Sequence, residues 1–142
     1  MTVSALIVRE TCISIVINGA ISVGIGLLLF GLDRPVPSAA LAWDFLPQSF
    51  MIALMGTLVP ALLLRKRLGV GVGDILRRAV AMAVAAALLP GALAALLTRI
   101  SLNGSMDAGD VLLLKAVYGA TLAAVVTPIM LIALVRQSGN QT

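Results

Sequence analysis

Four polar side chains recur at every fourth position near the start of the chain: Glu10, Ser14, Asn18 and Ser22. Because a helix brings residues i and i+4 onto one face, this spacing predicts a polar stripe along one side of a helix. The stripe could line a polar path or a binding site. It could instead supply hydrogen bonds between helices, which contribute about 0.6 kcal/mol each on average in membranes. Asn18 is the most polar of the deep positions, and both interpretations depend on it.

Lys115 and Tyr118 form a second candidate group. They are three residues apart, which places them on one face of a helix. The Lys115 amine could extend to the membrane surface, or it could pair with a carboxylate of Asp33, Asp44 or Asp107. The residues that we expect at a polar path or binding site are therefore Glu10, Ser14, Asn18, Ser22, Lys115 and Tyr118.

Few residues suit other kinds of chemistry. The chain has no histidine and one cysteine, Cys12, which excludes an internal disulfide and a zinc site of the Cys/His type. No pair of nucleophile and base is evident, and the glycine-rich stretch 69–73 lacks the Lys-Ser/Thr ending of a phosphate-binding loop. We therefore predict a non-enzymatic protein without a cofactor or metal.

Four charge-free segments of about 20 residues each must position these side chains, because about 20 helical residues rise roughly 30 Å and match the hydrocarbon core of a bilayer. Apolar residues make up 61% of the chain and charged residues 11%, against roughly 25% charged in soluble domains. We predict an all-α fold, a four-helix transmembrane bundle with up-down-up-down topology. Residues 1–142 then form one membrane domain, with spans at about 11–32, 46–64, 76–98 and 111–135. The first segment is too long for the core of a signal peptide, and we expect it to be retained.

Basic residues are distributed unevenly between the two expected sides of the membrane. Seven of the ten lie on the side of the chain ends and the 65–78 connection, and these are Arg9, Arg65, Lys66, Arg67, Arg77, Arg78 and Arg136. Short loops rich in Lys and Arg stay in the cytoplasm, so we predict a bacterial inner-membrane protein with both termini cytoplasmic. The same placement beside the spans makes a nucleic-acid partner unexpected.

Turn and cap residues predict where the helices begin. We expect Ser38 to start a short interfacial helix that ends near Trp43, and Pro47 to lie in the first turn of the second span. Asp74 and Asp110 should cap the third and fourth spans.

Small residues and prolines indicate how the spans pack. The third span carries small residues at every fourth position on two neighbouring rows, so it should be the most buried helix, or should serve both the bundle and an oligomer. Pro60, Pro90 and Pro128 each leave a carbonyl without its helical partner, and for Pro60 this is the carbonyl of Gly56. Threonines such as Thr57, Thr121 and Thr127, a water molecule or a bound ion could satisfy these carbonyls. The similar stretches 56–60 and 124–128 also suggest two tandem helical hairpins.

Two functions follow from these patterns. The first is an oligomeric or accessory subunit in the lipid bilayer, with a second copy or another membrane protein as partner, because the small faces exceed what four helices need. The alternative is a small transporter or channel with a polar path lined by the first span.

Overall fold

The computed structural model describes residues 2–139, which form four long helical spans. They are α1 (Val3–Phe30), α2 (Ser38–Leu68), a third span made of α3 (Val72–Ala86), the π turn η1 (Ala87–Gly91) and α4 (Ala92–Ser101), and α5 (Ala108–Gly139). All four spans are long and apolar enough to cross a membrane. The predicted all-α, four-helix membrane fold is therefore confirmed.

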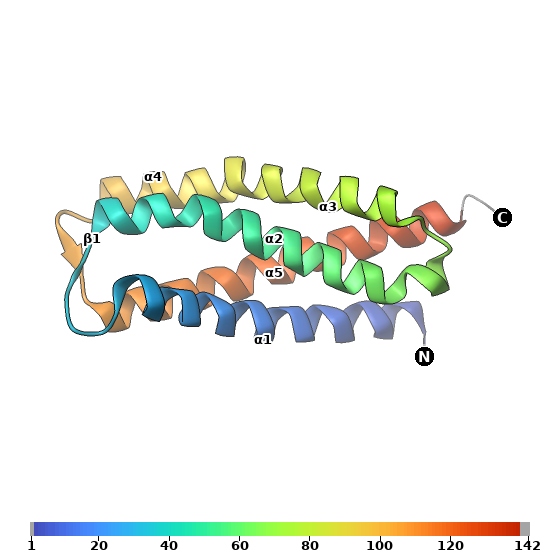
Figure 1. Cartoon of the computed structure of the whole chain (residues 1–142), viewed down its shortest axis with the longest axis horizontal. Helices are drawn as coiled ribbons and strands as arrows, with labels where there is room; N and C mark the ends of the chain where they lie inside the picture. The colour runs from blue at the N-terminus through green and yellow to red at the C-terminus, as the bar shows by residue number, and fades with distance from the viewer. Residues whose placement is uncertain (1, 140–142) are drawn as a thin grey trace.

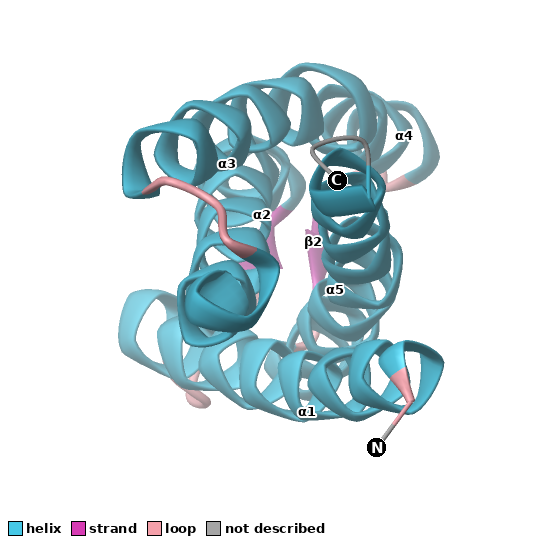
Figure 2. Ribbon diagram, turned by 90° about the vertical axis from the view of Figure 1, so that its right-hand side faces the viewer, coloured by secondary structure: helices cyan, strands magenta, loops and turns pink. Residues whose placement is uncertain are grey.

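The helices lie side by side along one axis, with both chain ends near the same end of the bundle (Figure 1). At the other end, β1 (Val36–Pro37) pairs antiparallel with β2 (Ser105–Met106), and this pairing joins the two connections that precede α2 and α5. In the view along the bundle, α1 and the third span lie on opposite sides, with α2 and α5 between them (Figure 2).

Helices that are consecutive in the chain are not always the closest neighbours. α1 packs mainly on α5, whereas α2 packs on the third span and on α5; α1 and α2 contact each other at few points. The first helix of each hairpin thus packs on the second helix of the other hairpin. Two tandem hairpins related by a two-fold axis would pack in this way, and the duplication stays a prediction.

The helix starts differ from the sequence-based predictions. α2 begins at Ser38 and continues through Pro47, so the separate short helix ending near Trp43 was wrong. A proline inside a helix removes one hydrogen bond, and Pro47 is exposed, so its ring displaces no packed side chain. Gly71 caps α3, and Asp74 and Asp110 lie in the first turns of α3 and α5. There their charges still favour the helix N-termini.

The third span is the least buried of the four, which contradicts the prediction that it is the most buried. In its most apolar window 17% of the residues are buried, against 44% for α2 and for α5. The reason is its position, because it packs chiefly on α2 while α2 and α5 have neighbours on both sides. Its small residues Ala79, Ala83 and Gly91 are buried inside the bundle.

The prolines are accommodated locally. Around Pro90 the helix widens into η1, where the N–H of Ala92 reaches the carbonyl of Ala87. The Gly56 carbonyl, which Pro60 leaves without its helical partner, accepts a hydrogen bond from Thr127 Oγ1 at 2.8 Å. The predicted threonine partner for this carbonyl is therefore confirmed.

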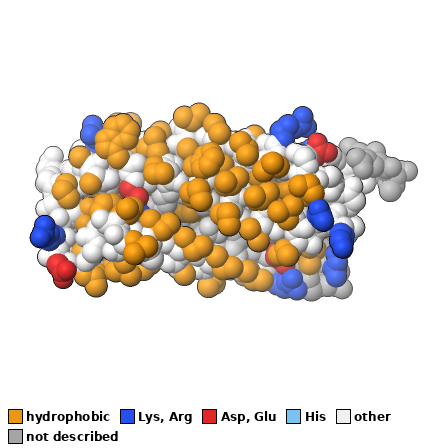
Figure 3. Space-filling view, viewed as in Figure 1, with side chains coloured by type: hydrophobic (Ala, Val, Ile, Leu, Met, Phe, Trp, Pro, Cys, Tyr) orange, Lys and Arg blue, Asp and Glu red, His pale blue; other side chains and the backbone are white. Residues whose placement is uncertain are grey.

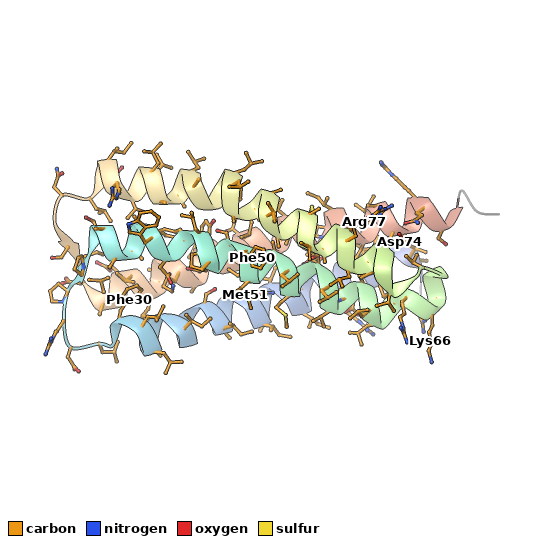
Figure 4. All side chains as sticks on the ribbon, turned by 45° about the horizontal axis from the view of Figure 1, so that its top comes forward. Phe30, Phe50, Met51, Lys66, Asp74 and Arg77 are labelled. Carbon is orange, nitrogen blue, oxygen red and sulfur yellow. The ribbon has the colours of Figure 1, made fainter. Side chains whose placement is uncertain are left out.

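On the face that Figure 3 shows, apolar side chains cover the middle, and the Lys and Arg side chains lie toward the two ends. Large exposed residues such as Val16, Leu28, Leu63 and Leu89 belong to this apolar surface. Lys66, Asp74 and Arg77 lie toward the end of the bundle that holds the 69–71 connection (Figure 4). The surface is that of a protein whose middle lies in lipid and whose ends reach the headgroups.

Candidate functional site

The polar stripe of α1 faces the inside of the bundle. Glu10, Ser14, Asn18 and Ser22 are all buried, between 1% and 5% exposed, and Gly26 continues the stripe by one more turn. The other side of α1 carries the exposed apolar residues. The expected inward direction of the stripe is confirmed, and it follows from the lower cost of a buried polar group that finds a partner.

Ser14 and Asn18 belong to a hydrogen-bonded chain that joins three helices. Asn18 Nδ2 donates to Ser14 O at 2.8 Å and to Ser14 Oγ at 3.1 Å, and the hydroxyl oxygens of Ser14 and Thr127 are 2.8 Å apart. Thr127 in turn bonds the Gly56 carbonyl of α2. The carbonyl only accepts and the amide nitrogen only donates, so the hydroxyl protons must point from Ser14 to Thr127 and from Thr127 to Gly56.

Lys115 lies in a second polar cluster, nearer the end of the bundle that holds β1 and β2. Its ammonium forms an ion pair with Asp44 and donates to Gln48 Oε1 at 2.9 Å. The Gln48 side-chain amide donates to Ser22 Oγ at 3.2 Å and to the Lys115 carbonyl at 3.4 Å. The Phe30 ring centroid lies 5.6 Å from the ammonium. Of the alternatives for Lys115, pairing with Asp44 is therefore the one observed.

The burial of this ion pair bears directly on function. The Lys115 side chain is fully buried and that of Asp44 is 9% exposed. A buried ion pair adds little net stability, because desolvation of both charges offsets their attraction. An ionisable residue inside a membrane-spanning segment, such as Lys115, therefore indicates a functional site.

Tyr118 lies apart from the α1 stripe and contacts α2. Its hydroxyl is 2.6 Å from Ser49 Oγ, which also donates to the Phe45 carbonyl at 2.5 Å. Its ring packs edge-on against Phe45, with centroids 4.9 Å apart. Tyr118 thus connects α5 to α2 through Ser49, whereas the sequence analysis grouped it with Lys115.

A groove between α1 and α2 runs past both polar clusters. Its larger part, the Asp44 pocket, has a volume of about 340 Å³ and is lined by Asp44, Gln48 and Ser22 among apolar residues. The smaller part, the Glu10 pocket, has about 170 Å³ and is lined by Glu10 and Ser14. The two pockets share Asn18, Ile21 and Met55.

Glu10 lies at the far end of this groove from Asp44. Its carboxylate is paired with its neighbour Arg9, at 2.6 Å between Arg9 Nη2 and Glu10 Oε1. The Arg9 side chain is 59% exposed, whereas that of Glu10 is 5% exposed. The groove therefore has one carboxylate toward each end and the Asn18 amide between them.

Sequence reasoning missed Gln48 as a member of the site and named Asp44 only as one possible partner of Lys115. Gln48 lies in a charge-free segment, but its side-chain amide inside a span indicates a buried polar site as much as the amide of Asn18 does. Its spacing of four residues from Asp44 was the available signal, because both side chains share one helical face.

Comparison with protein-family models, with curated proteins and with solved structures gave no match to this chain. The fold therefore defines the class, which is a small helical membrane protein with four spans.

Proposed function

We propose that this protein is a small membrane transporter or channel whose path follows the groove between α1 and α2. The observation that carries the proposal is the buried Lys115–Asp44 ion pair, which reaches the groove through Asp44 and Gln48. The polar groups are spread along the groove from Asp44 to Glu10. A purely structural role would need hydrogen bonds between helices, but it would not need a cavity beside them.

The packing of α1 also favours a path at this position. α1 is held by α5 and makes few contacts with α2, so the groove can widen without disrupting the main helix contacts. Among the groove residues, Met51 and Met55 have flexible side chains that can rearrange around a solute.

Flux through purified protein in liposomes tests the proposal. We expect Asn18→Leu to abolish uptake of the solutes that the wild-type protein carries, in a panel of inorganic and small organic cations. Val16→Leu is the matched control, because Val16 lies on the same helix but is 70% exposed on the surface of the bundle. Unchanged uptake by a folded Asn18→Leu protein would contradict the path.

The accessory or oligomeric subunit is the second candidate. Some small residues of the third span, such as Ala83 and Gly91, are buried inside the bundle, but Ala81 and Ala85 are exposed at a spacing of one turn. Ala81 lines a shallow crevice together with Ile129 and Ala133 of α5, and Ala85 lies one turn further along the third span. A partner helix could approach closely here. If this function is correct, Ala85→Leu will disrupt an oligomer or complex and leave flux unchanged.

We propose further that the end of the bundle that holds the 69–71 connection faces the cytoplasm of a bacterium. Most basic residues of the chain lie toward this end, and Lys66 and Arg77 are examples (Figure 4). Positively charged short loops favour this orientation.

A further inference from the structure

We propose that the Asp44 pocket binds an amphipathic organic cation, whose charged group contacts Asp44 in place of Lys115. This inference rests on the proposed transport function and names the class of its substrate. Three observations support it: the shape of the pocket, the charge of its lining residues, and the contacts that Lys115 keeps when Asp44 binds another cation.

The walls of the pocket require an occupant that is mostly apolar. Most of the lining residues are apolar, among them Ile25, Leu29, Pro47 and Met51, and four are polar or charged. The volume of about 340 Å³ lies within the range of sites for small organic molecules. A small hydrated inorganic ion would leave the apolar walls without contacts.

The charge of the lining favours a cation. Asp44 is the charged residue in the lining of this pocket, and Glu10 is the charged residue in the lining of the adjoining one. Lys115 is fully buried behind Asp44 and does not line either pocket. The described lining of the groove therefore offers a carboxylate to a cation and no basic side chain to an anion, although Glu10 at the far end is already paired with Arg9.

Lys115 keeps other partners when Asp44 turns to a ligand. Its ammonium still donates to Gln48 Oε1 and still lies near the face of Phe30. A ring face attracts a cation, and the attraction is stronger away from water. Lys115 thus acts as an internal competitor that holds Asp44 when the pocket is empty and releases it when a cation arrives.

Tetraphenylphosphonium is a suitable probe, because tetraphenylborate has nearly the same shape and the opposite charge. Binding to the purified full chain is measured by equilibrium dialysis. We expect the cation to bind and the anion to bind weakly or not at all. Comparable binding of both ions would overturn the proposal, because it would reflect the apolar walls alone.

The double variant Asp44→Asn/Lys115→Met removes the carboxylate without leaving a buried charge unpaired. We expect it to bind tetraphenylphosphonium about tenfold more weakly or worse, a loss of about 1.4 kcal/mol or more. Asp74→Asn is the control, because Asp74 is a partly exposed acid at the far end of the bundle. Unchanged affinity in a folded double variant would overturn the proposal.

Two further measurements do not depend on the folding of that variant. Lys115→Met removes the competitor and should tighten the binding of tetraphenylphosphonium. Unchanged or weaker binding would contradict the proposal that the cation replaces Lys115 as the partner of Asp44. In the wild-type protein, tetraphenylphosphonium should slow the modification of Asp44 by dicyclohexylcarbodiimide. Mass spectrometry measures the rate of this modification. Modification at an unchanged rate would place the probe elsewhere.

These results separate this inference from the transport proposal. If another solute crosses the membrane in an Asn18-dependent way but tetraphenylphosphonium does not bind, the path stands and the substrate class is wrong. If the probe binds at Asp44 but Asn18→Leu leaves every flux unchanged, the site stands and the path is wrong.

Discussion

Replacing Gly119 of α5 by alanine should push α1 away from α5. A Cβ atom at position 119 would overlap Ser22 Oγ and lie 3.0 Å from Ser22 Cβ and 3.1 Å from the backbone oxygen of Asn18. The Ser22 side chain can rotate, but the Asn18 backbone belongs to the helix and cannot yield alone. The helices must therefore separate by a few tenths of an ångström, at the position where the polar stripe passes.

Two opposing effects determine the size of the change. Overpacking of a tight contact costs about 1–3 kcal/mol, whereas alanine is better than glycine in a helix by about 1 kcal/mol. Gly24→Ala isolates the second effect, because a Cβ atom there has no neighbour within 4 Å. The free energy of unfolding of Gly119→Ala should therefore lie about 1–3 kcal/mol below that of Gly24→Ala.

Unfolding in mixed micelles with increasing dodecyl sulfate, followed by circular dichroism, measures both variants under one condition. Flux and probe binding by Gly119→Ala should also fall, because Ser22 and Asn18 both line the Asp44 pocket. Equal stability of the two alanine variants would refute the close approach of α1 and α5. The inward placement of the stripe against α5 would then have to be abandoned.

Three other predictions concern the polar contacts and the orientation. Thr127→Val leaves the Gly56 carbonyl without its partner and should cost about 0.6–1.7 kcal/mol in the same unfolding assay, while Thr127→Ser should retain the wild-type stability. Asp44→Asn alone leaves the Lys115 charge buried without a carboxylate and should lower the free energy of unfolding by about 3–5 kcal/mol. A second change of Lys115 to methionine should restore most of this stability, and no restoration would argue against the ion pair. A phosphatase reporter, active only outside the cytoplasm, should be inactive when fused after Thr142, and an active fusion would reverse the proposed orientation.

The sequence was sufficient to predict the four helices, because the criterion is physical and local. A run of about 20 residues without charge matches the bilayer core whatever its neighbours are. The inward direction of the α1 stripe was predictable for a similar reason, since a stripe that faced lipid would leave the Ser14 and Ser22 hydroxyls without their partners on other helices.

The partners of these residues were not predictable, because they depend on which helices are neighbours. Lys115 had three carboxylates to choose from, and only the approach of α5 to α2 selects Asp44. The same approach brings Tyr118 to Ser49. The continuation of α2 through Pro47 was not predictable either, because it depends on which side of the helix is exposed. A proline on the exposed side of a helix need not end the helix.

The packing of α1 on the last helix has a consequence for biosynthesis. When the first three spans have left the ribosome, the Ser14 hydroxyl of α1 still lacks Thr127, and Gln48 still lacks Lys115. Until α5 arrives, these groups must bond water, lipid headgroups or an insertion factor. A chain that stops before Ala108 should therefore be a preferred target of membrane quality control, even though each of its spans is apolar enough to insert.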